Sequence, residues 1–448
     1  MDYLELARDM MSKASAGGAE AEAIIIESQT TNIEVGRGQV EQLSQAVSKG
    51  LGLRVIEGGR VGYAYTSDFG PESLEETGQA AQALAQSADA DQFRALPETK
   101  PVPEEELEIF DPDFEGVTTE AKVEFLLTVE RTALAYDPRV VASVRCVYQD
   151  GLARVYLANS RGFSGWYQRS GGGSFIMAVA RDEEGQTMGT GFDASVFYRE
   201  LDPEKIGREA GRKAVEILGG KPVETQEISV VMDPTVGAEF LAFLAQALTA
   251  EAMQRGRSFL IDKMGTTIGT ELVNLVDNGR LRRGLASAPF DGEGVPTTLT
   301  RLIKAGVLER VIYDTYTARK DGISSTGNAG RGSHRSLPSL GPTNFYLEPS
   351  DTPPEEIMAG VERGLYVTNT MGLAGINPVS GDYSVGASGL WIEHGQLTKP
   401  VTAVTVAATM LDMLGRLTAV GNDLRFVPMF GSVGSPTIRI DGMVVAGK

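Results

Sequence analysis

The side chains that most often bind catalytic metals are scarce in this chain. Its 448 residues include two histidines, His334 and His394, and one cysteine, Cys146. A catalytic zinc site needs about three converging protein ligands, and a His-Glu-x-x-His helix supplies two of them together with a general base. Neither histidine has a carboxylate or a thiol at ligand spacing on a helix. The sequence therefore indicates no catalytic metal site built from this chain alone.

Cys146 and His394 are each better explained by structure than by chemistry. Cys146 lies in an apolar stretch, residues 141–147, that is typical of a strand, so we expect a buried, inert thiol rather than a nucleophile. His394 precedes Gly395 and is typical of a hairpin tip rather than a metal ligand. A single cysteine also excludes an intrachain disulfide and favours a reducing compartment.

The glycine-rich segments do not match a known catalytic loop. The sequence has no Gly-x-Ser-x-Gly between a strand and a helix, which a serine nucleophile elbow would require. The glycines at 171–173 are not followed by the Lys-Ser/Thr of a phosphate-binding loop, and residues 327–330 lack the flanking strand and helix of a dinucleotide site. We expect turns at both places.

One long polar loop, residues 317–335, has a composition suited to ligand binding. It carries five basic or imidazole groups, several hydroxyls, and glycines that let backbone amides point outward. Such a loop could bind a carboxylate or a phosphate. A flexible lid or a contact with a partner protein would have the same composition. The loop alone does not decide between these roles.

The charge and the hydrophobic profile exclude other classes of function. The 60 acidic residues outnumber the 41 basic ones and give a net charge of -19, which disfavours binding to nucleic-acid phosphates. The N-terminus has acids where a signal peptide needs a basic segment. No apolar run approaches the roughly 18 residues of a membrane span. We expect a cytoplasmic protein that binds neither membranes nor nucleic acid directly.

The hydrophobic pattern predicts an α+β fold of antiparallel meanders with flanking helices, divided into three domains. Residues 1–110 have a helix, a β-meander, a second helix and an acidic, proline-containing linker. Residues 111–222 have four strands between two helices, and residues 223–448 form a large glycine-rich α+β domain. Within the last domain, residues 236–254 predict a helix that is apolar nearly all round and therefore buried.

Several segments, in this order along the chain, resemble the TldD/PmbA family, the so-called modulators of DNA gyrase. They are TAR at 317–319, STGN at 325–328, TNFY at 343–346, GDYS at 381–384, GQLTKP at 395–400, VGNDL at 420–424 and GSPTIRI at 434–440. Upstream, NSRGF at 159–163 and the meander at 35–66 also match. The resemblance covers nearly the whole chain.

The resemblance implies a peptide-processing metallopeptidase with one catalytic and one non-catalytic subunit around an enclosed chamber. The family's catalytic branch carries H-E-x-x-x-H, and its key positions fall at Leu241, Ala242 and Gln246 here. Leucine and alanine cannot bind zinc, and glutamine is at best a weak ligand. The cysteine ligand of that branch is missing as well, because no cysteine occurs in residues 423–434. The chain therefore resembles the PmbA/TldE branch, whose members are expected to pair with a zinc-bearing TldD-type subunit.

The leading hypothesis is accordingly a PmbA/TldE-type subunit that binds no metal or cofactor itself, while zinc in its partner activates water. The chain would form one wall of the chamber and hold unfolded or modified peptides, by strand addition along an exposed sheet edge. Candidate contacts with the peptide, each of which could equally serve to shape its own loop, are Arg319, Asn328, Arg331, His334, Asn422 and Asp423.

Two other hypotheses remain open. The chain could be a non-enzymatic peptide-binding or regulatory homodimer that needs no protease partner. The least favoured alternative is a protease with a metal site of its own. Metal analysis of the purified chain separates this last hypothesis from the others, and peptidase assays with an H-E-x-x-x-H homologue separate the first two.

Overall fold

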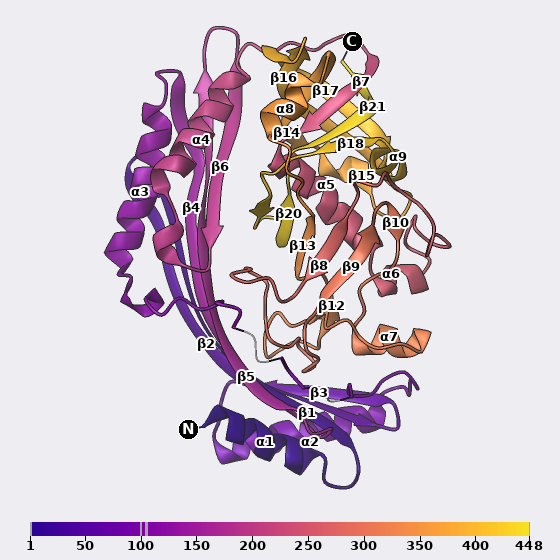
Figure 1. The fold of residues 1–448 in the computed structure, drawn as a ribbon. Coiled ribbons are helices and arrows are strands. Elements are labelled where there is room, and N and C mark those ends of the chain that lie inside the picture. Colours follow the sequence, from indigo (N-terminus) through magenta and orange to yellow (C-terminus); the bar gives the residue numbers. More distant parts are fainter. Residues whose placement is uncertain (1, 99–100, 104–105, 448) are drawn as a thin grey trace.

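The computed structural model describes residues 2–98, 101–103 and 106–447 (Figure 1). Within these residues, none of the helices has both the length and the apolar character needed to cross a bilayer. The chain forms a long curved sheet with helices on its outer side, and a C-terminal part that lies beside the inner side of that sheet (Figure 1).

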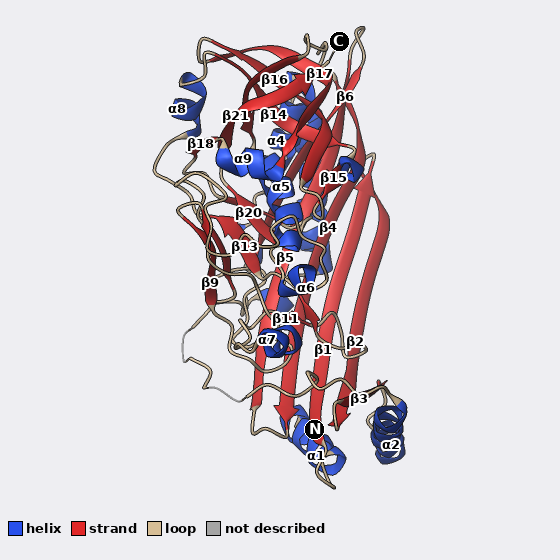
Figure 2. Cartoon of the chain, turned by 90° about the vertical axis from the view of Figure 1, so that its right-hand side faces the viewer, coloured by secondary structure: helices blue, strands red, loops and turns tan. Residues whose placement is uncertain are grey.

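The long sheet has six strands in the order β3-β2-β1-β4-β5-β6, and every neighbouring pair is antiparallel. Figure 2 shows how the strands run along much of the molecule. Their bounds are β1 Glu20–Gly36, β2 Gln39–Glu57, β3 Arg60–Thr66, β4 Val140–Asn159, β5 Ser164–Arg181 and β6 Gln186–Ser195. The strands predicted for the first two domains therefore share one sheet. The division of the chain after residues 110 and 222 stays a prediction.

The turn predicted at residues 171–173 is wrong, because these glycines lie in the middle of β5. Apolar segments at 140–148 and 154–158 predict two separate strands, but β4 runs unbroken through both. The glycines allow close contact between strands: a Cβ on Gly173 would lie 2.6 Å from the carbonyl oxygen of Asp193 on β6, and one on Gly172 would lie 2.8 Å from the Cβ of Asp150 on β4. A run of glycine therefore marks tight packing here and not a chain reversal.

Four helices cover the outer face of the long sheet in two groups. The helices α1 (Tyr3–Ala14) and α2 (Pro71–Ser87) pack on its lower end, where a cluster of small and aliphatic residues is buried. The helices α3 (Thr119–Ala135) and α4 (Pro203–Glu216) cover the upper end over a second core. Cys146 belongs to that second core, and burial raises the pKa of its thiol, as expected for an inert cysteine.

The C-terminal part holds two more sheets around the largest hydrophobic core. One contains β7 Gln226–Met232, β14 Arg363–Met371, β15 Ile376–Asn377, β16 Asp382–Glu393, β17 Gln396–Thr409, β18 Leu417–Val420 and β21 Ile438–Ala446. The other contains β8 Leu275–Asn278, β9 Leu299–Lys304, β10 Val307–Leu308, β13 Asn344–Leu347, β19 Arg425–Val427 and β20 Ser432–Ser435. Only the pairs β7–β14 and β13–β20 are parallel among these described strands. The α+β fold with antiparallel sheets is therefore confirmed.

Shorter elements complete the described chain. They are the helices α5 Pro234–Ala247, α6 Ala250–Gln254, α7 Thr315–Asp321, α8 Pro354–Ala359 and α9 Met410–Gly415, the 3-10 turns Phe114–Gly116, Tyr198–Glu200 and Leu373–Gly375, and the small hairpin of β11 Ala329–Gly330 and β12 Ser339–Leu340. The hairpin tip predicted at His394 is confirmed: His394 and Gly395 join β16 to β17 with φ of 51° and 75°.

The buried helix predicted for residues 236–254 is interrupted. The helix α5 ends at Ala247, and Thr249 adopts an extended conformation before α6 begins. The Thr249 hydroxyl accepts a hydrogen bond from the backbone N–H of Ala252, which makes it the N-cap of α6. Thr249 also forms a parallel bridge with Ile312. Apolar periodicity alone did not reveal this cap.

Candidate functional site

Two cavities lie between the inner face of the long sheet and the C-terminal part. The lower one, here called the polar cavity, has a volume of about 490 Å³. The upper one, here called the apolar cavity, has a volume of about 560 Å³. Both volumes fall within the usual range of ligand pockets, roughly 300–1,000 Å³. Because side chains alternate along a strand, every second residue of β4 and β5 faces this boundary.

The polar cavity lies between the loops of the C-terminal part and the strands β1, β2, β4 and β5. Its lining residues include Asn328, Arg331 and His334, so the structure brings together three of the six residues that the sequence singled out. The sheet contributes hydroxyl and aliphatic side chains together with one further arginine: Ile24, Ile26, Ser28, Thr30, Ser48, Ala153, Val155, Tyr167 and Arg169.

Arg331 belongs to a buried ion cluster that joins the long sheet to the C-terminal part. Its guanidinium pairs with the carboxylate of Glu22 on β1. Arg54 on β2 also pairs with Glu22, at 2.9 Å, and with Glu293 of the C-terminal part, at 3.2 Å. All four side chains are at most 7% exposed. Burial alone would lower the pKa of Arg54, but the two carboxylates raise it above its ordinary value.

Asp291 lies beside this cluster and is held by backbone donors. Its Oδ1 accepts hydrogen bonds from the N–H groups of Glu293 and Val295, both at 2.9 Å, and its Oδ2 accepts one from Ala329 at 3.0 Å. Burial and the nearby negative charge of Glu293 raise the pKa of Asp291 to about 8. These contacts fix the strand that leads to Arg331.

Asn328 is buried and organises the same loop. Its amide nitrogen donates to Asp277 Oδ2 at 2.7 Å and to the carbonyl oxygen of Gly341 at 3.2 Å. Thr343 donates to the same aspartate through its backbone N–H, at 2.7 Å, and its hydroxyl, at 2.8 Å. Burial raises the pKa of Asp277 despite these donors. Asn328 therefore closes the loop of residues 328–343 onto β8.

His334 is buried against the lower end of β2 and β3. Its Nε2 lies 3.4 Å from the Ser67 hydroxyl, its ring meets that of Tyr65 edge to face, and its backbone carbonyl accepts a 2.7 Å hydrogen bond from Tyr63. Burial and the charge of Arg335 lower the pKa of His334, which disfavours the charged form of its imidazole. Its ring nitrogens can exchange a hydrogen bond with a peptide.

The other three candidates lie away from the polar cavity. Arg319 on α7 donates to the backbone carbonyl of Phe93 at 3.1 Å and ties down the segment after α2. Asp423 accepts hydrogen bonds from the backbone N–H and hydroxyl of Thr437, at 2.9 Å and 2.7 Å, and so fixes the start of β21. Asn422 is exposed beside it. None of the three lines either cavity in the described structure.

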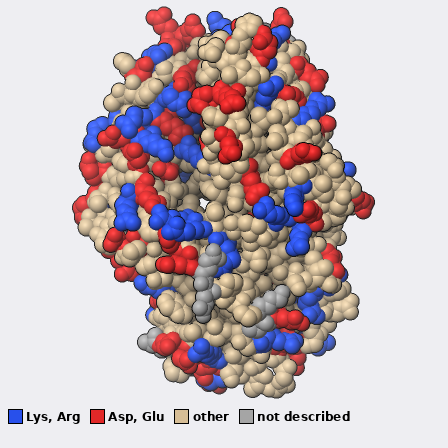
Figure 3. All heavy atoms as spheres, viewed as in Figure 1, with Lys and Arg blue, Asp and Glu red and all other residues tan. Residues whose placement is uncertain are grey.

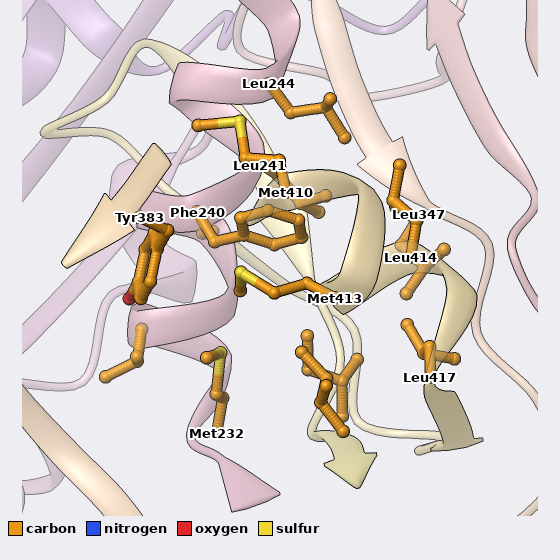
Figure 4. Packing of buried hydrophobic residues seen from close by; sticks show 14 of the residues in the cluster. Met232, Phe240, Leu241, Leu244, Leu347, Tyr383, Met410, Met413, Leu414 and Leu417 are labelled. Carbon is orange, nitrogen blue, oxygen red and sulfur yellow. The ribbon is translucent and has the colours of Figure 1, made fainter. Parts of the chain in front are cut away.

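The three positions on α5 to which the resemblance assigns a metal motif do not fit a zinc ion. Leu241 is 1% exposed and points into the C-terminal core, near Phe240, Leu244 and Met410 in Figure 4. Ala242 packs on the same core, while Gln246 is exposed near the helix end. The described residues also contain no group of three or more His, Cys, Asp or Glu side chains placed to hold a metal. We therefore derive no reaction step through a metal in this chain.

One ionisable residue on α5 escaped the sequence analysis. Glu239 is buried, and burial raises the pKa of its carboxyl to about 7 although Thr370 donates a 2.7 Å hydrogen bond to Oε2. Its Oε1 has no hydrogen-bond partner, and the buried hydroxyl of Tyr383 has none either. The signal in the sequence was a single acidic residue within an otherwise apolar helix. A carboxyl group buried in such a helix must either have a partner or have a raised pKa.

The upper half of β2 forms a free edge of the long sheet. The strand β3 pairs only with residues 51–57 of β2, so residues 39–49 have β1 on one side and no neighbouring strand on the other among the described residues. All eleven side chains of this segment are exposed, and Val47 is 79% exposed. Ser48, near the end of the segment, also lines the polar cavity. An open edge of this length can accept a further strand.

The apolar cavity lies above the polar one, where β4, β5 and β6 face two loops of the C-terminal part. Its lining residues are Arg145, Val147, Gln149, Asp150, Gly171, Gly172, Gly173, Ser174, Phe175, Met177, Phe192, Asp193, Ala194, Leu285, Pro428 and Met429. Figure 3 shows that acidic and basic side chains intermingle on the surface around the boundary between the two parts, despite the net negative charge.

A second ion cluster joins the two parts at the upper end. Lys213 of α4 is 1% exposed and pairs with Glu209 at 3.1 Å and with Asp233, the N-cap of α5, at 3.3 Å. Arg425 on β19 pairs with Glu209 at 2.6 Å and stacks on the Phe192 ring. The boundary that contains the cavities is therefore fixed by buried charges at both ends.

Models of one protein family match most of the chain. A PmbA/TldA metallopeptidase domain 1 matches residues 21–85, the central domain of the same family matches residues 112–218, and its C-terminal domain matches residues 225–447. The Metalloprotease PmbA of Escherichia coli O157:H7 is 28% identical over 95% of this chain and 94% of its own length. A Metalloprotease TldD homolog of Haemophilus influenzae is 26% identical over 92% of this chain and 89% of its own length.

Solved structures share the fold over the whole chain. A protein of Thermotoga maritima described as a modulator of a DNA gyrase superposes with a TM-score of 0.91 at 27% identity and covers 99% of this chain and 100% of its own. TldE from Thermococcus kodakarensis superposes with a TM-score of 0.89 and covers 99% of both chains. At 22% identity, the second likeness concerns the fold alone.

Proposed function

The chain belongs to the PmbA/TldA metallopeptidase family, and from that premise we propose that it is the PmbA/TldE-type subunit of a two-subunit metallopeptidase. Zinc would be bound by a TldD-type partner, where it activates water for attack on a peptide carbonyl. This chain would supply one wall of the chamber and hold unfolded or modified peptides. The family and its metalloprotease relatives support a role connected with peptide hydrolysis.

The observation that carries the proposal is the packing of α5. At the position where the resemblance places the first metal ligand, Leu241 is 1% exposed within the largest hydrophobic core. Binding zinc there would require both new ligands and a rearranged core, because protein interiors are close-packed. Catalytic zinc sites instead keep an open coordination position in a cleft. A subunit that contributes shape rather than metal is the simplest role consistent with this packing.

The boundary between the long sheet and the C-terminal part supplies the peptide-binding wall in this proposal. Ser28, Thr30 and Arg169 offer polar groups from the sheet within the polar cavity. Arg331 and Asn328 act mainly by holding the opposite wall, since their polar atoms already bind protein groups. The free edge at residues 39–49 of β2 is where an extended peptide, or a strand of the partner, would add.

The test is reconstitution with a homologue that carries H-E-x-x-x-H. Each subunit is purified alone, the two are mixed, and complex formation and hydrolysis of an unfolded peptide are measured. The proposal expects a stable heteromeric complex whose activity clearly exceeds that of either subunit. A TldD-type subunit that is fully active alone and does not bind this chain would overturn it, and a stable homodimer of this chain that binds peptide would favour the regulatory alternative.

A further inference from the structure

The lining of the apolar cavity combines hydrophobic side chains with the exposed guanidinium group of Arg145. The side chains of Val147, Phe175, Met177 and Phe192 line it from the sheet, and Leu285 and Met429 line it from the C-terminal part. Arg145 is paired with Met177 in the β4–β5 register, so its side chain leaves the sheet on the same face. Arg145 is exposed, and in the described part of the chain its guanidinium has no ion pair or hydrogen bond to a side chain.

The two aspartates of the lining do not neutralise Arg145, because they point to the other face of the sheet. Asp150 and Asp193 are one residue out of phase with the side chains that fill the cavity wall. Asp150 pairs with Lys122 of α3 at 2.6 Å, on the helix-covered side. Among the described lining residues, the side chains on the inner face are therefore apolar except for Gln149 and Arg145, and Arg145 carries the charge. The positive charge lies in a chain with a net charge of -19.

The glycines of β5 shape the floor of this cavity. Phe175 and Met177 face the cavity with large side chains. Gly171 and Gly173 follow on the same face of β5 but carry no side chain, so the strand backbone itself lines the cavity there. A Cβ on Gly171 would lie 3.1 Å from Leu285, which shows how closely the opposite wall approaches at that point. A larger side chain at Gly171 would therefore press against Leu285.

We propose that the apolar cavity binds the carboxyl-terminal end of a peptide, with the apolar side chain of its last residue inside the cavity and its terminal carboxylate on Arg145. An arginine matches a carboxylate in charge and in geometry. Apolar side chains give up water on entering a cavity of this kind. This inference rests on the proposed function, because it takes peptides to be the molecules that enter the boundary between the two parts.

The experiment measures binding of short probes to the full chain alone, without the partner subunit. N-acetyl-leucyl-phenylalanine is compared with its C-terminal amide and with N-acetyl-leucyl-serine by titration calorimetry or ligand-observed NMR. We expect the acid to bind about fivefold more tightly than the amide, as for a solvent-exposed ion pair. The serine probe is expected to bind at least about tenfold more weakly, because its side chain cannot fill the cavity.

Two variants assign the effect to this cavity. Arg145→Gln is expected to remove the preference for acid over amide, whereas Arg131→Gln, at an exposed arginine on the outer face of α3, is expected to keep it. Ala194→Phe places a large side chain in the cavity from β6. We expect it to lower the affinity for both the acid and the amide of N-acetyl-leucyl-phenylalanine at least about tenfold. If that variant does not fold, Met429→Ser at the exposed side of the cavity provides the same test with a smaller loss of affinity.

The outcomes separate this inference from the proposed function. Equal binding of acid and amide to the native chain, or a preference that survives Arg145→Gln, overturns the assignment even if unfolded peptides are still hydrolysed with the partner. Binding of dodecanoate as tight as that of the peptide acid assigns the cavity to free acyl chains and overturns it as well. Acid-selective binding lost in Arg145→Gln supports the cavity even if the reconstituted pair shows no peptidase activity.

Discussion

Arg331 and Glu22 form an ion pair between side chains that are 3% and 0% exposed, 309 residues apart in the sequence. The pair ties the loop after β11 to the first strand of the long sheet, and Arg54 and Glu293 extend it into a cluster of four charges. Buried charges are expensive to desolvate, so each depends on its partners. The cluster fixes one end of the boundary where both cavities lie.

Replacing Arg331 is therefore expected to destabilise the protein strongly. Arg331→Met would leave Glu22 with a single partner, and we expect a loss of about 3 kcal/mol in the free energy of unfolding, measured from denaturant midpoints. Arg319→Met is the matched control, because that side chain is exposed and bonds only to backbone carbonyls. We expect the control to cost less than about 1 kcal/mol. Similar losses for both variants would show that the buried cluster contributes nothing special.

Glu239 predicts a specific dependence of stability on pH. Its pKa is raised to about 7 in the folded protein, from an ordinary value near 4.5. Folding then favours the protonated form, so the stability contributed by Glu239 is fully present below about pH 4.5 and is lost as the pH rises through 7. Glu239→Gln should remove that loss. We expect the variant to gain about 2 to 3 kcal/mol relative to the native chain between pH 5 and pH 8.5.

Thermal or denaturant unfolding of the native chain and of Glu239→Gln between pH 5 and pH 8.5 measures the difference in their stability. Asp291, whose pKa is also raised, contributes equally to both proteins and cancels in the comparison. A difference in stability that stays constant from pH 5 to pH 8.5 would mean that the carboxyl of Glu239 titrates near its ordinary value.

Much of the fold was predictable because the relevant signals are local. Asp2 and Thr118 cap the N-termini of α1 and α3 through their own side chains. The turn at His394 and Gly395 and the apolar faces of the long helices likewise depend on residues close together in the sequence. The glycines at 171–173 led to a wrong prediction of a turn. Their role depends on Asp193 and Leu285, which come close to them only in the folded chain. The Thr249 cap was likewise hidden within an apolar run.

The candidate site was only partly accessible from sequence. The polar loop correctly drew attention to Asn328, Arg331 and His334, which line one cavity. Sequence could not show that Arg331 pairs with Glu22 or that burial lowers the pKa of His334, since both depend on β-strands hundreds of residues away. The apolar cavity was not foreseen, because its walls come from three strands and two distant loops that carry no motif.

The packing of α5 makes a further prediction for the positions of the missing metal motif. Leu241→Ala should cost about 3 kcal/mol in unfolding free energy, because it leaves a cavity in the largest core. Gln246→Ala on the same helix is exposed and should change stability by less than about 0.5 kcal/mol. Chemical denaturation of both variants tests this. A small effect of Leu241→Ala would indicate that the core around Leu241 is loosely packed. That result would contradict the proposal, which takes α5 to be a closely packed helix that binds no metal.

The free edge of β2 can be tested with proline at adjacent positions. Along an edge strand, alternate backbone N–H groups point outward, so only one of Gln45→Pro and Ala46→Pro removes a free donor. That variant should weaken binding of an unfolded peptide or of the partner subunit with little change in stability. The other variant should lower stability, because it breaks the ladder with β1. Unchanged binding in both would exclude residues 39–49 as the docking edge.

The most direct measurement is the zinc content of each subunit after an active complex with an H-E-x-x-x-H homologue has been separated into its two chains. Mass spectrometry of metals in the separated subunits, with hydrolysis of an unfolded peptide as the activity readout, compares them side by side. The account predicts about one zinc per partner subunit, well below one per chain in this protein, and no hydrolysis by this chain alone. Close to one tightly bound zinc in this chain, together with hydrolysis by the chain alone, would contradict it.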